Sequence, residues 1–348
     1  MTSEWSRRDL MKGAVMASAL PACAPAWAQG PPAGLPPQGP QPPPPPPGVK
    51  RLDPALDALI DADAKVEVLL EGFRATEGPC WVGGKDGYLL FSDPGENVVR
   101  RWSAKAGVSE WLRPSGYAGG PSPIFREPGA NGLIPARGGI VMADVGNRGL
   151  ARVDFKTKAK TMLARDFEGK RLNSPNDLVL APDGSIYFTD PPFGLNGTLK
   201  SPAREMDYMG VFRMARDGTL SLIDKSVNVP NGIGLSPDGR TLYTTEMQTG
   251  WLAWTLDAKG RPTDRRVYVD SKSTGIAGGD GFKIDGLGNM WTSSREGISI
   301  ISPQGQRLGY VSTGGRAANC ELGADGYLYI SGGPRIVRVA IKAPKIRV

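Results

Sequence analysis

The sequence predicts an all-β fold, a six-bladed β-propeller, from a repeated unit, its spacing and the composition. Each unit has an Asn, Asp or Glu, an apolar strand, a glycine-containing turn about eight residues later and a second strand. The units begin at positions 77, 131, 176, 231, 280 and 319. Spacings of roughly 40–55 residues with short alternating strands are typical of propeller blades. The 47 glycines and 32 prolines among 348 residues also favour many short strands joined by turns.

The last unit is short, and this predicts how the ring closes. After Tyr329 only residues 336–341 can form another strand, whereas residues 66–70 form a spare strand before the first unit. A propeller hides its sheet edges by pairing them. We therefore expect the N-terminal strand at 66–70 to complete and close the last blade.

Residues 1–28 resemble a twin-arginine signal peptide. Ser6-Arg7-Arg8-Asp9-Leu10 is followed by an apolar stretch at 13–22 and by Ala26-Trp27-Ala28, which fits a cleavage site. The stretch is shorter than the roughly 20 residues that span a bilayer, so we expect no membrane span. The expected partner is the twin-arginine translocase and the expected location is the periplasm. A weaker lipoprotein motif before Cys23 leaves lipid anchoring as an alternative.

A proline-rich linker is predicted at residues 29–50. Its unbroken proline run at 42–47 favours an extended polyproline II conformation. Asp53-Pro54 then has the pattern of an N-cap and first-turn proline, which predicts a short helix over residues 55–62. Residues 51–348 form the predicted propeller domain.

Charge and histidine content exclude several classes of function. The formal net charge is +7, but the chain has no long run of like charges and no basic stripe with interleaved aromatic residues. We therefore expect no nucleic-acid partner. The chain has no histidine, which excludes Ser-His-Asp and Cys-His nucleophile systems and His-ligated zinc or haem. Acid–base chemistry must then use carboxylates, Lys, Tyr or metal-bound water.

Six polar residues are predicted at one end of the central channel, because each unit's first strand lines it. They are Glu77, Asn131, Asn176, Asn231, Asp280 and Asn319. Asn and Asp before Gly are also common in turns, so for Asn131 and Asn319 a turn role is equally open. Glu77 has no such turn chemistry. Two carboxylates in a narrow channel repel each other unless a cation neutralises them, and all-oxygen ligands favour Ca²⁺, Mg²⁺ or Mn²⁺.

The motifs around these residues resemble the gluconolactonase, senescence-marker-protein (regucalcin) and luciferin-regenerating-enzyme family. The resemblance extends from about residue 53 to the C-terminus, and its motifs are Glu77-Gly78-Pro79-Cys80-Trp81, Leu90-Phe91-Ser92-Asp93, Asn173-Ser174-Pro175-Asn176-Asp177, Phe188-Thr189-Asp190-Pro191-Pro192-Phe193-Gly194, Pro230-Asn231-Gly232, Ser236-Pro237-Asp238-Gly239 and Asp280-Gly281. It implies a divalent metal, most often Ca²⁺ with Mn²⁺, Mg²⁺ and Zn²⁺ as alternatives, held by Glu77, Asn231 and Asp280. Asn176 would help to hold the metal or the substrate. Two positions depart from the family pattern: Val145 stands where bacterial members often have histidine, and Ser174 where animal members have arginine.

The resemblance implies hydrolysis of lactones, mainly sugar lactones. In this hypothesis the metal polarises the lactone carbonyl and Asp280 assists the attacking water. Candidate substrate-binding residues are Asn131, Asn173, Asn176, Arg148 and Arg171. Two alternatives stay open: a related esterase or phosphotriesterase that uses the same metal site, and a non-catalytic propeller that binds calcium or sugar.

Cys80 and Cys320 occupy early positions in the first strands of the first and last units. These blades are neighbours in a closed ring, so a disulfide is one expectation for an oxidising compartment. Two buried free thiols are the other.

Overall fold

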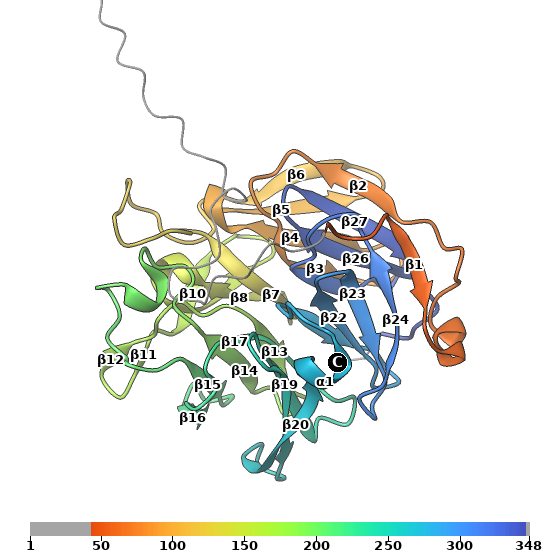
Figure 1. Ribbon diagram of the computed structural model, residues 1–348. Coiled ribbons are helices and arrows are strands. Elements are labelled where there is room, and N and C mark those ends of the chain that lie inside the picture. The colour runs from red at the N-terminus through yellow and green to blue at the C-terminus, as the bar shows by residue number, and fades with distance from the viewer. Residues whose placement is uncertain (1–42, 346–348) are drawn as a thin grey trace, which may run out of the picture.

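A computed structural model describes residues 43–345 of the chain. Figure 1 shows antiparallel sheets arranged in chain order round a central channel. Six of these sheets have four or five strands each, which confirms the six-bladed β-propeller. The predicted signal peptide and most of the predicted linker lie outside the described residues.

The strands of each blade run outward from the channel in chain order. The innermost strands are β3 (Glu77–Val82), β7 (Ala130–Ala136), β13 (Leu178–Leu180), β17 (Pro230–Leu235), β21 (Phe282–Ile284) and β25 (Asn319–Leu322). The second strands are β4 (Tyr88–Asp93), β8 (Gly139–Asp144), β14 (Ile186–Asp190), β18 (Thr241–Glu246), β22 (Met290–Ser294) and β26 (Tyr327–Gly332). The third strands are β5 (Val98–Ser103), β9 (Gly149–Asp154), β15 (Gly210–Met214), β19 (Gly250–Leu256), β23 (Gly297–Ile301) and β27 (Arg335–Ala340). The outer strands are β6 (Gly107–Leu112), β10 (Lys160–Ala164), β16 (Leu220–Asp224), β20 (Pro262–Asp270), β24 (Arg307–Ser312) and, for the last blade, β2 (Glu67–Glu71).

Few further regular elements accompany the blade strands in the described part of the chain. The additional elements are β1 (Gly48–Arg51), a ribbon of β11 (Asp166–Phe167) and β12 (Lys170–Arg171), the short helix α1 (Ser271–Thr274), and the 3₁₀ turns Pro54–Ala58, Pro94–Glu96, Val145–Asn147 and Thr198–Lys200. In residues 43–345 no helix is long and apolar enough to cross a bilayer.

Two local predictions near the N-terminus need correction. Residues 48–50, predicted as the end of the linker, belong to strand β1. The helix predicted over 55–62 is a 3₁₀ turn at Pro54–Ala58, although Asp53 caps it as expected by accepting a hydrogen bond from the Ala55 N–H at 2.8 Å. The turn stays short because Leu56, Leu59 and Ile60 insert into the apolar core shared by the last two blades.

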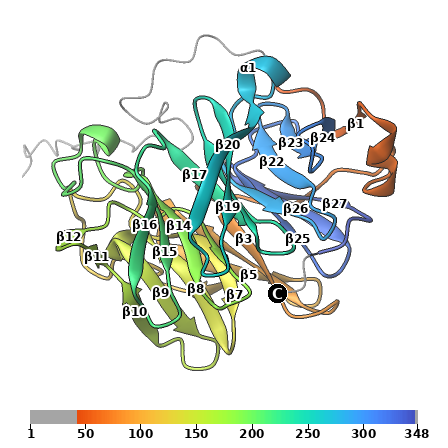
Figure 2. The same cartoon turned by 90° about the horizontal axis from the view of Figure 1, so that it is seen from below.

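The N-terminal segment closes the ring. Strand β2 pairs antiparallel with β27, with Glu67 opposite Arg338 and Glu71 opposite Arg335, which confirms the spare-strand prediction. Strand β1 pairs with β24 and adds a fifth strand to the preceding blade. In Figures 1 and 2 the orange N-terminal strands therefore lie beside the blue C-terminal ones.

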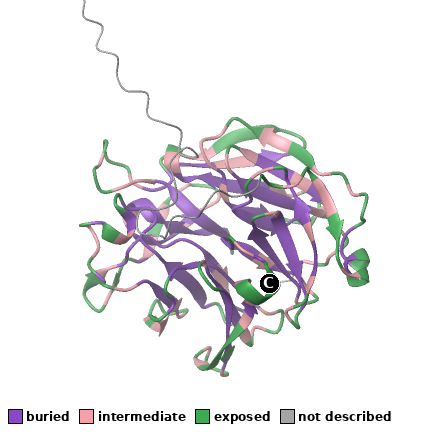
Figure 3. Cartoon of the chain, viewed as in Figure 1, coloured by how far each residue is buried: buried purple, intermediate pink, exposed green. Residues whose placement is uncertain are grey.

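The core lies between neighbouring blades, where buried strands face one another, while exposed residues lie in the peripheral turns (Figure 3). Blades one and six meet through Trp81 and Tyr329, whose rings stack with centroids 5.3 Å apart. At the channel the backbones approach even more closely. A Cβ atom at Gly78 would lie 2.1 Å from the Asn131 carbonyl oxygen, and one at Gly232 would lie 2.5 Å from the Asp280 carbonyl oxygen. The glycines after Glu77 and Asn231 are thus needed for these inner strands to touch the next blade.

Thr76 joins the first blade to the last one. Its buried hydroxyl donates to the Arg335 carbonyl oxygen at 2.7 Å and accepts from the Gly332 N–H at 2.8 Å.

We expect Thr76→Val to lower the free energy of unfolding by about 1–3 kcal/mol, because it leaves a buried N–H and a buried carbonyl unpaired without changing the side-chain shape. Urea unfolding measures the change. Thr161→Val, on the exposed face of β10, is the matched control and should change stability little; equal effects of both substitutions would contradict the role assigned to Thr76.

Candidate metal and substrate site

A cavity of about 650 Å³ opens at the end of the channel where the inner strands begin. Its lining includes five of the six predicted channel residues: Glu77, Asn131, Asn176, Asn231 and Asp280. They come from five consecutive blades, so the ring itself brings together residues separated by up to about 200 positions in the sequence.

The three asparagines form a hydrogen-bonded chain across the cavity floor. Asn131 Nδ2 donates to Asn176 Oδ1 at 2.9 Å, and Asn176 Nδ2 donates to Asn231 Oδ1 at 2.6 Å. Asn231 Nδ2 in turn lies 3.3 Å from the sulfur of Met247. An amide oxygen has two lone pairs, so Asn176 and Asn231 each keep one for a ligand in the cavity.

The two carboxyl groups lie in a buried environment that opposes their ionisation. The Gly78 N–H donates to Glu77 Oε2 at 3.3 Å, and the Asp280 N–H donates to Ser293 Oγ at 2.7 Å. Burial raises the pKa of Glu77 well above its usual range, and the nearby Asp280 carboxylate raises it further. Burial also raises the pKa of Asp280, opposed by the guanidinium of Arg316. Simultaneous ionisation of the two carboxyl groups is therefore unfavourable.

A divalent cation fits this arrangement. Glu77 and Asp280 would supply two anionic oxygens, and Asn176 and Asn231 two neutral ones, in a set without nitrogen or sulfur ligands. In residues 43–345 no group of three or more His, Cys, Asp or Glu side chains is arranged to hold a metal. An ion at this site therefore depends on the amide oxygens, which suits cations that accept mixed oxygen ligands in irregular geometry.

Asn319 lies outside the cavity lining, because the repeat in the last blade is offset by one residue. Equivalent backbone hydrogen bonds link successive blades: Gly132 N–H to Asn176 O at 2.8 Å, Gly232 N–H to Asp280 O at 3.0 Å, and Gly281 N–H to Ala318 O at 2.7 Å. Ala318, not Asn319, thus occupies the position of Asp280 in the last blade. The side chain of Asn319 lies deeper in the channel, where its Nδ2 is 3.4 Å from Asp177 Oδ2.

The structure does not bring Arg148, Arg171 and Asn173 into the cavity lining. Arg148 Nε donates to the Leu172 carbonyl oxygen at 2.8 Å, and Arg171 donates through Nη2 to the Asn147 carbonyl oxygen at 2.8 Å. Asn173 is completely buried and donates through Nδ2 to the Asp190 carbonyl oxygen at 3.0 Å. The polar groups of these three residues therefore support the loops beside the cavity.

The sequence analysis missed the charged loop residues that line the cavity. Arg126 and Glu127 form an ion pair with 2.6 Å between Nη2 and Oε1, and Arg316 Nη2 lies 3.1 Å from Asp280 Oδ2. These residues belong to connections between blades, which the strand repeat does not describe. The sequence held one indication that a loop residue serves the last blade's sector of the cavity. Ala318 is apolar at the position where the other five blades place a polar residue.

Cys80 and Cys320 are buried free thiols, so the disulfide alternative is excluded. Burial raises the pKa of both thiols to about 12, which makes them poor nucleophiles at neutral pH. They contribute to the apolar packing of the first and last blades.

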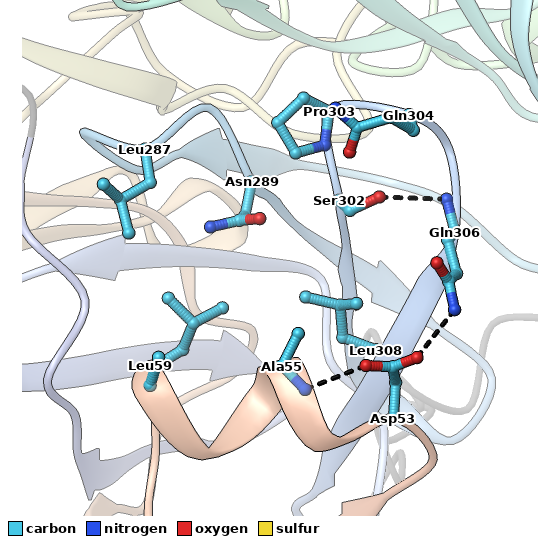
Figure 4. A pocket seen from close by; sticks show the side chains of 11 residues that line it. Asp53, Ala55, Leu59, Leu287, Asn289, Ser302, Pro303, Gln304, Gln306 and Leu308 are labelled. Atoms are coloured by element: carbon cyan, nitrogen blue, oxygen red, sulfur yellow. Dashed lines mark hydrogen bonds between the residues drawn. The ribbon is translucent and has the colours of Figure 1, made fainter.

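A second hollow, of about 320 Å³, lies on the outside of the ring between the 3₁₀ turn at Pro54–Ala58 and the turns of the fifth blade. Figure 4 shows that its polar groups bond to one another: Asp53 accepts from Ala55 and from Gln306, which also bonds to Ser302. Its lining has three amide side chains, Asn289, Gln304 and Gln306, but one carboxylate, Asp53, where the channel cavity has Glu77 and Asp280 together. The channel cavity is therefore the better candidate for a functional site.

Fold and site together define a six-bladed propeller with an oxygen-lined cavity at one end of its channel. Residues 75–332 match the family described as the SMP-30/Gluconolactonase/LRE-like region, and the chain belongs to this family. It is 40% identical over 311 residues to a gluconolactonase from Zymomonas mobilis. The aligned region covers 84% of this chain and 86% of that protein.

Solved structures agree with this assignment. A gluconolactonase from Xanthomonas campestris is 31% identical, with a TM-score of 0.73 over 88% of this chain and 99% of that one. Regucalcin from Agrobacterium tumefaciens, described as a calcium-binding protein, has a TM-score of 0.63 over 81% of this chain and 97% of that one. At 19% identity the second likeness supports the fold alone.

Asp190, at the end of β14, has an unusual environment beside the cavity loops. The side chain is completely buried; Oδ2 accepts from the Asn173 N–H at 2.7 Å, whereas Oδ1 has no hydrogen-bond partner. Burial raises its pKa from 3.8 to about 7, although the backbone N–H groups of Asn173 and Ser174 oppose the rise.

We expect Asp190→Asn to make the stability less dependent on pH. The folded protein keeps this proton up to about pH 7, whereas the unfolded chain loses it near pH 3.8. The wild-type free energy of unfolding should therefore fall as pH rises across that window, by at most about 1.4 kcal/mol per pH unit. Asparagine cannot ionise, so the variant should gain stability relative to wild type until about pH 7 and then keep a constant difference. Urea unfolding between about pH 5 and 8 tests this, and a constant difference over the whole range would contradict it.

Proposed function

We propose that this protein hydrolyses lactones and that its substrates are sugar lactones. The observation that carries the proposal is the cavity in which Glu77, Asn176, Asn231 and Asp280 meet in a member of a gluconolactonase family. The 40% identity with the Zymomonas mobilis gluconolactonase extends across most of both chains and supports the same substrate class. A cavity of about 650 Å³ also has the size of an ordinary small-molecule site and can enclose one sugar ring.

The proposal includes a divalent cation, with Ca²⁺ preferred over Mn²⁺, Mg²⁺ or Zn²⁺. Glu77, Asn176, Asn231 and Asp280 would hold it, and their oxygen-only donor set with mixed charge favours calcium. When bound, such an ion polarises the lactone carbonyl and stabilises the oxyanion that forms during attack.

Asp280 is the proposed proton acceptor for the attacking water. Its backbone is fixed, because its carbonyl oxygen accepts from the Thr245 hydroxyl at 2.8 Å and from the Gly232 N–H at 3.0 Å. Burial raises its pKa, which makes the ionised carboxylate a stronger base than an exposed aspartate. Asn131 and Asn176 also line the cavity, where their amides can bind the hydroxyl groups of a sugar ring.

We expect Asp280→Asn to lower kcat for sugar lactones by roughly 10²–10⁴-fold, because the amide keeps the size of the side chain but cannot accept the proton. Hydrolysis of a panel of aldonolactones at constant pH, corrected for spontaneous opening, measures the rate. Chelation should abolish turnover, and added Ca²⁺ or Mn²⁺ should restore it. The matched control is Asp264→Asn, on the exposed face of β20.

The other outcomes separate the alternatives. Turnover that survives both chelation and Asp280→Asn would contradict the proposed mechanism. Metal-dependent hydrolysis of aryl esters or phosphotriesters without lactone turnover would assign the related esterase function. Calcium or sugar binding without hydrolysis of any of these substrates would assign a binding propeller.

We also propose that the protein is exported to the periplasm by the twin-arginine translocase. The support is Arg7-Arg8 followed by an apolar stretch and an Ala-x-Ala motif. Replacing both arginines with lysine should retain the unprocessed precursor in the cytoplasm, because the translocase requires the arginine pair. Cell fractionation measures this, and normal export of the variant would contradict the proposal. A Cys23→Ser variant serves as the control for lipid anchoring: it should release the protein from membranes only if Cys23 carries a lipid.

A further inference from the structure

One sector of the cavity lacks the polar side chain that the other five blades supply. Ala318 occupies the position equivalent to Asp280, as the hydrogen bond from the Gly281 N–H shows. Arg316 comes two residues earlier, in the connection from β24 to β25, and its side chain lines the cavity in that sector. The last blade therefore contributes a guanidinium where the others contribute a carboxylate or an amide.

The backbone that leads to Arg316 is fixed by hydrogen bonds. Arg335 Nη2 donates to the Thr313 carbonyl oxygen at 3.0 Å, and the Thr313 hydroxyl donates to the Gly315 carbonyl oxygen at 2.9 Å. The Ser312 hydroxyl donates to the carbonyl oxygen of Pro45, so the end of the proline-rich segment also supports this connection.

The side chain of Arg316, in contrast, has few contacts. It is 70% exposed, and its one recorded partner among the described residues is Asp280, with 3.1 Å between Nη2 and Oδ2. The other two arginines of the lining are engaged elsewhere: Arg126 with Glu127, and Arg335 with Thr313. Arg316 is thus the arginine of this cavity that contacts a proposed metal ligand.

A guanidinium and a divalent ion compete for the charge of Asp280. A cation at Asp280 draws on the same carboxylate charge and repels the positive guanidinium, which has exposed space to move into. The displaced Arg316 then faces the cavity with parallel N–H donors, the geometry that best matches a carboxylate.

We propose that Arg316 binds the carboxylate formed by ring opening, after a divalent ion has released it from Asp280. The inference rests on the proposed lactone hydrolysis. In that reaction water adds to the acyl carbon, the ring C–O bond breaks, the ring oxygen takes a proton, and the new acid ionises to a carboxylate. A neutral lactone thereby becomes an anion within reach of Arg316.

The first test is metal binding, which requires no turnover. In calorimetric titrations with Ca²⁺, Arg316→Gln should bind about tenfold more tightly than wild type, because the competing cation at Asp280 is gone. Arg126→Gln removes the same charge from the same cavity without touching Asp280, and should change Ca²⁺ affinity much less. Unchanged or weaker Ca²⁺ binding by Arg316→Gln would overturn the proposal.

The second test uses gluconate as a probe for the product carboxylate. With Ca²⁺ saturating, Arg316→Gln should bind gluconate about tenfold or more weakly than wild type, and Arg316→Lys should lie between them because it keeps the charge but not the paired donors. Equal gluconate binding by wild type and Arg316→Gln overturns the proposal, as does an absence of gluconate binding to Ca²⁺-loaded wild type. Failure of lactone turnover alone would contradict the proposed function and leave this binding result intact. Circular dichroism confirms that each variant is folded.

Discussion

The pairing of β2 with β27 is the interaction on which the rest of the structure depends. It joins a segment that precedes the first blade to the last strand of the final blade. Glu77 begins only six residues after β2 ends, and Thr76 between them is bonded to the backbone of Gly332 and Arg335. The cavity takes side chains from the first and last blades alike, so it has its shape only while this closure holds.

Close approach of the inner strands explains why successive blades place their polar side chains at equivalent positions round the cavity. The glycines after Glu77 and Asn231 leave no room for a Cβ atom against the next blade. Backbone hydrogen bonds between blades then place Asn176, Asp280 and Ala318 at equivalent positions along the channel. The Asn-Gly and Asp-Gly pairs resemble turn motifs in sequence. In this fold their glycines instead allow the inner strands of neighbouring blades to come into contact. Site geometry is therefore a consequence of ring packing.

This packing also determines what the sequence could and could not predict. The number of blades followed from the repeat, and closure by 66–70 followed from the missing outer strand of the last unit. Glu77 stood out because glutamate has no turn role. Asn319 was misaligned by one residue, since Asn319-Cys320 imitates the Asn-Gly start while Ala318 occupies the equivalent position. Arg148, Arg171 and Arg316 lie in connections outside the strand repeat, where periodicity does not predict side-chain direction. The three-dimensional contacts are needed to distinguish Arg148 and Arg171, which support loops, from Arg316, which reaches Asp280.

The charges of Glu77, Asp280 and Arg316 suggest why a propeller of this kind would combine acids with an arginine. When both carboxyl groups are ionised, these three groups carry one net negative charge before a divalent ion binds and one net positive charge after it binds. A lactone is neutral when it enters, whereas the transition state and the product are anionic. A cavity mouth that becomes positive only when the ion is bound would attract the transition state more strongly than the substrate, which is the condition for catalysis. The apolar Ala318 matters in this argument because a carboxylate there would cancel that surplus and leave no space for Arg316.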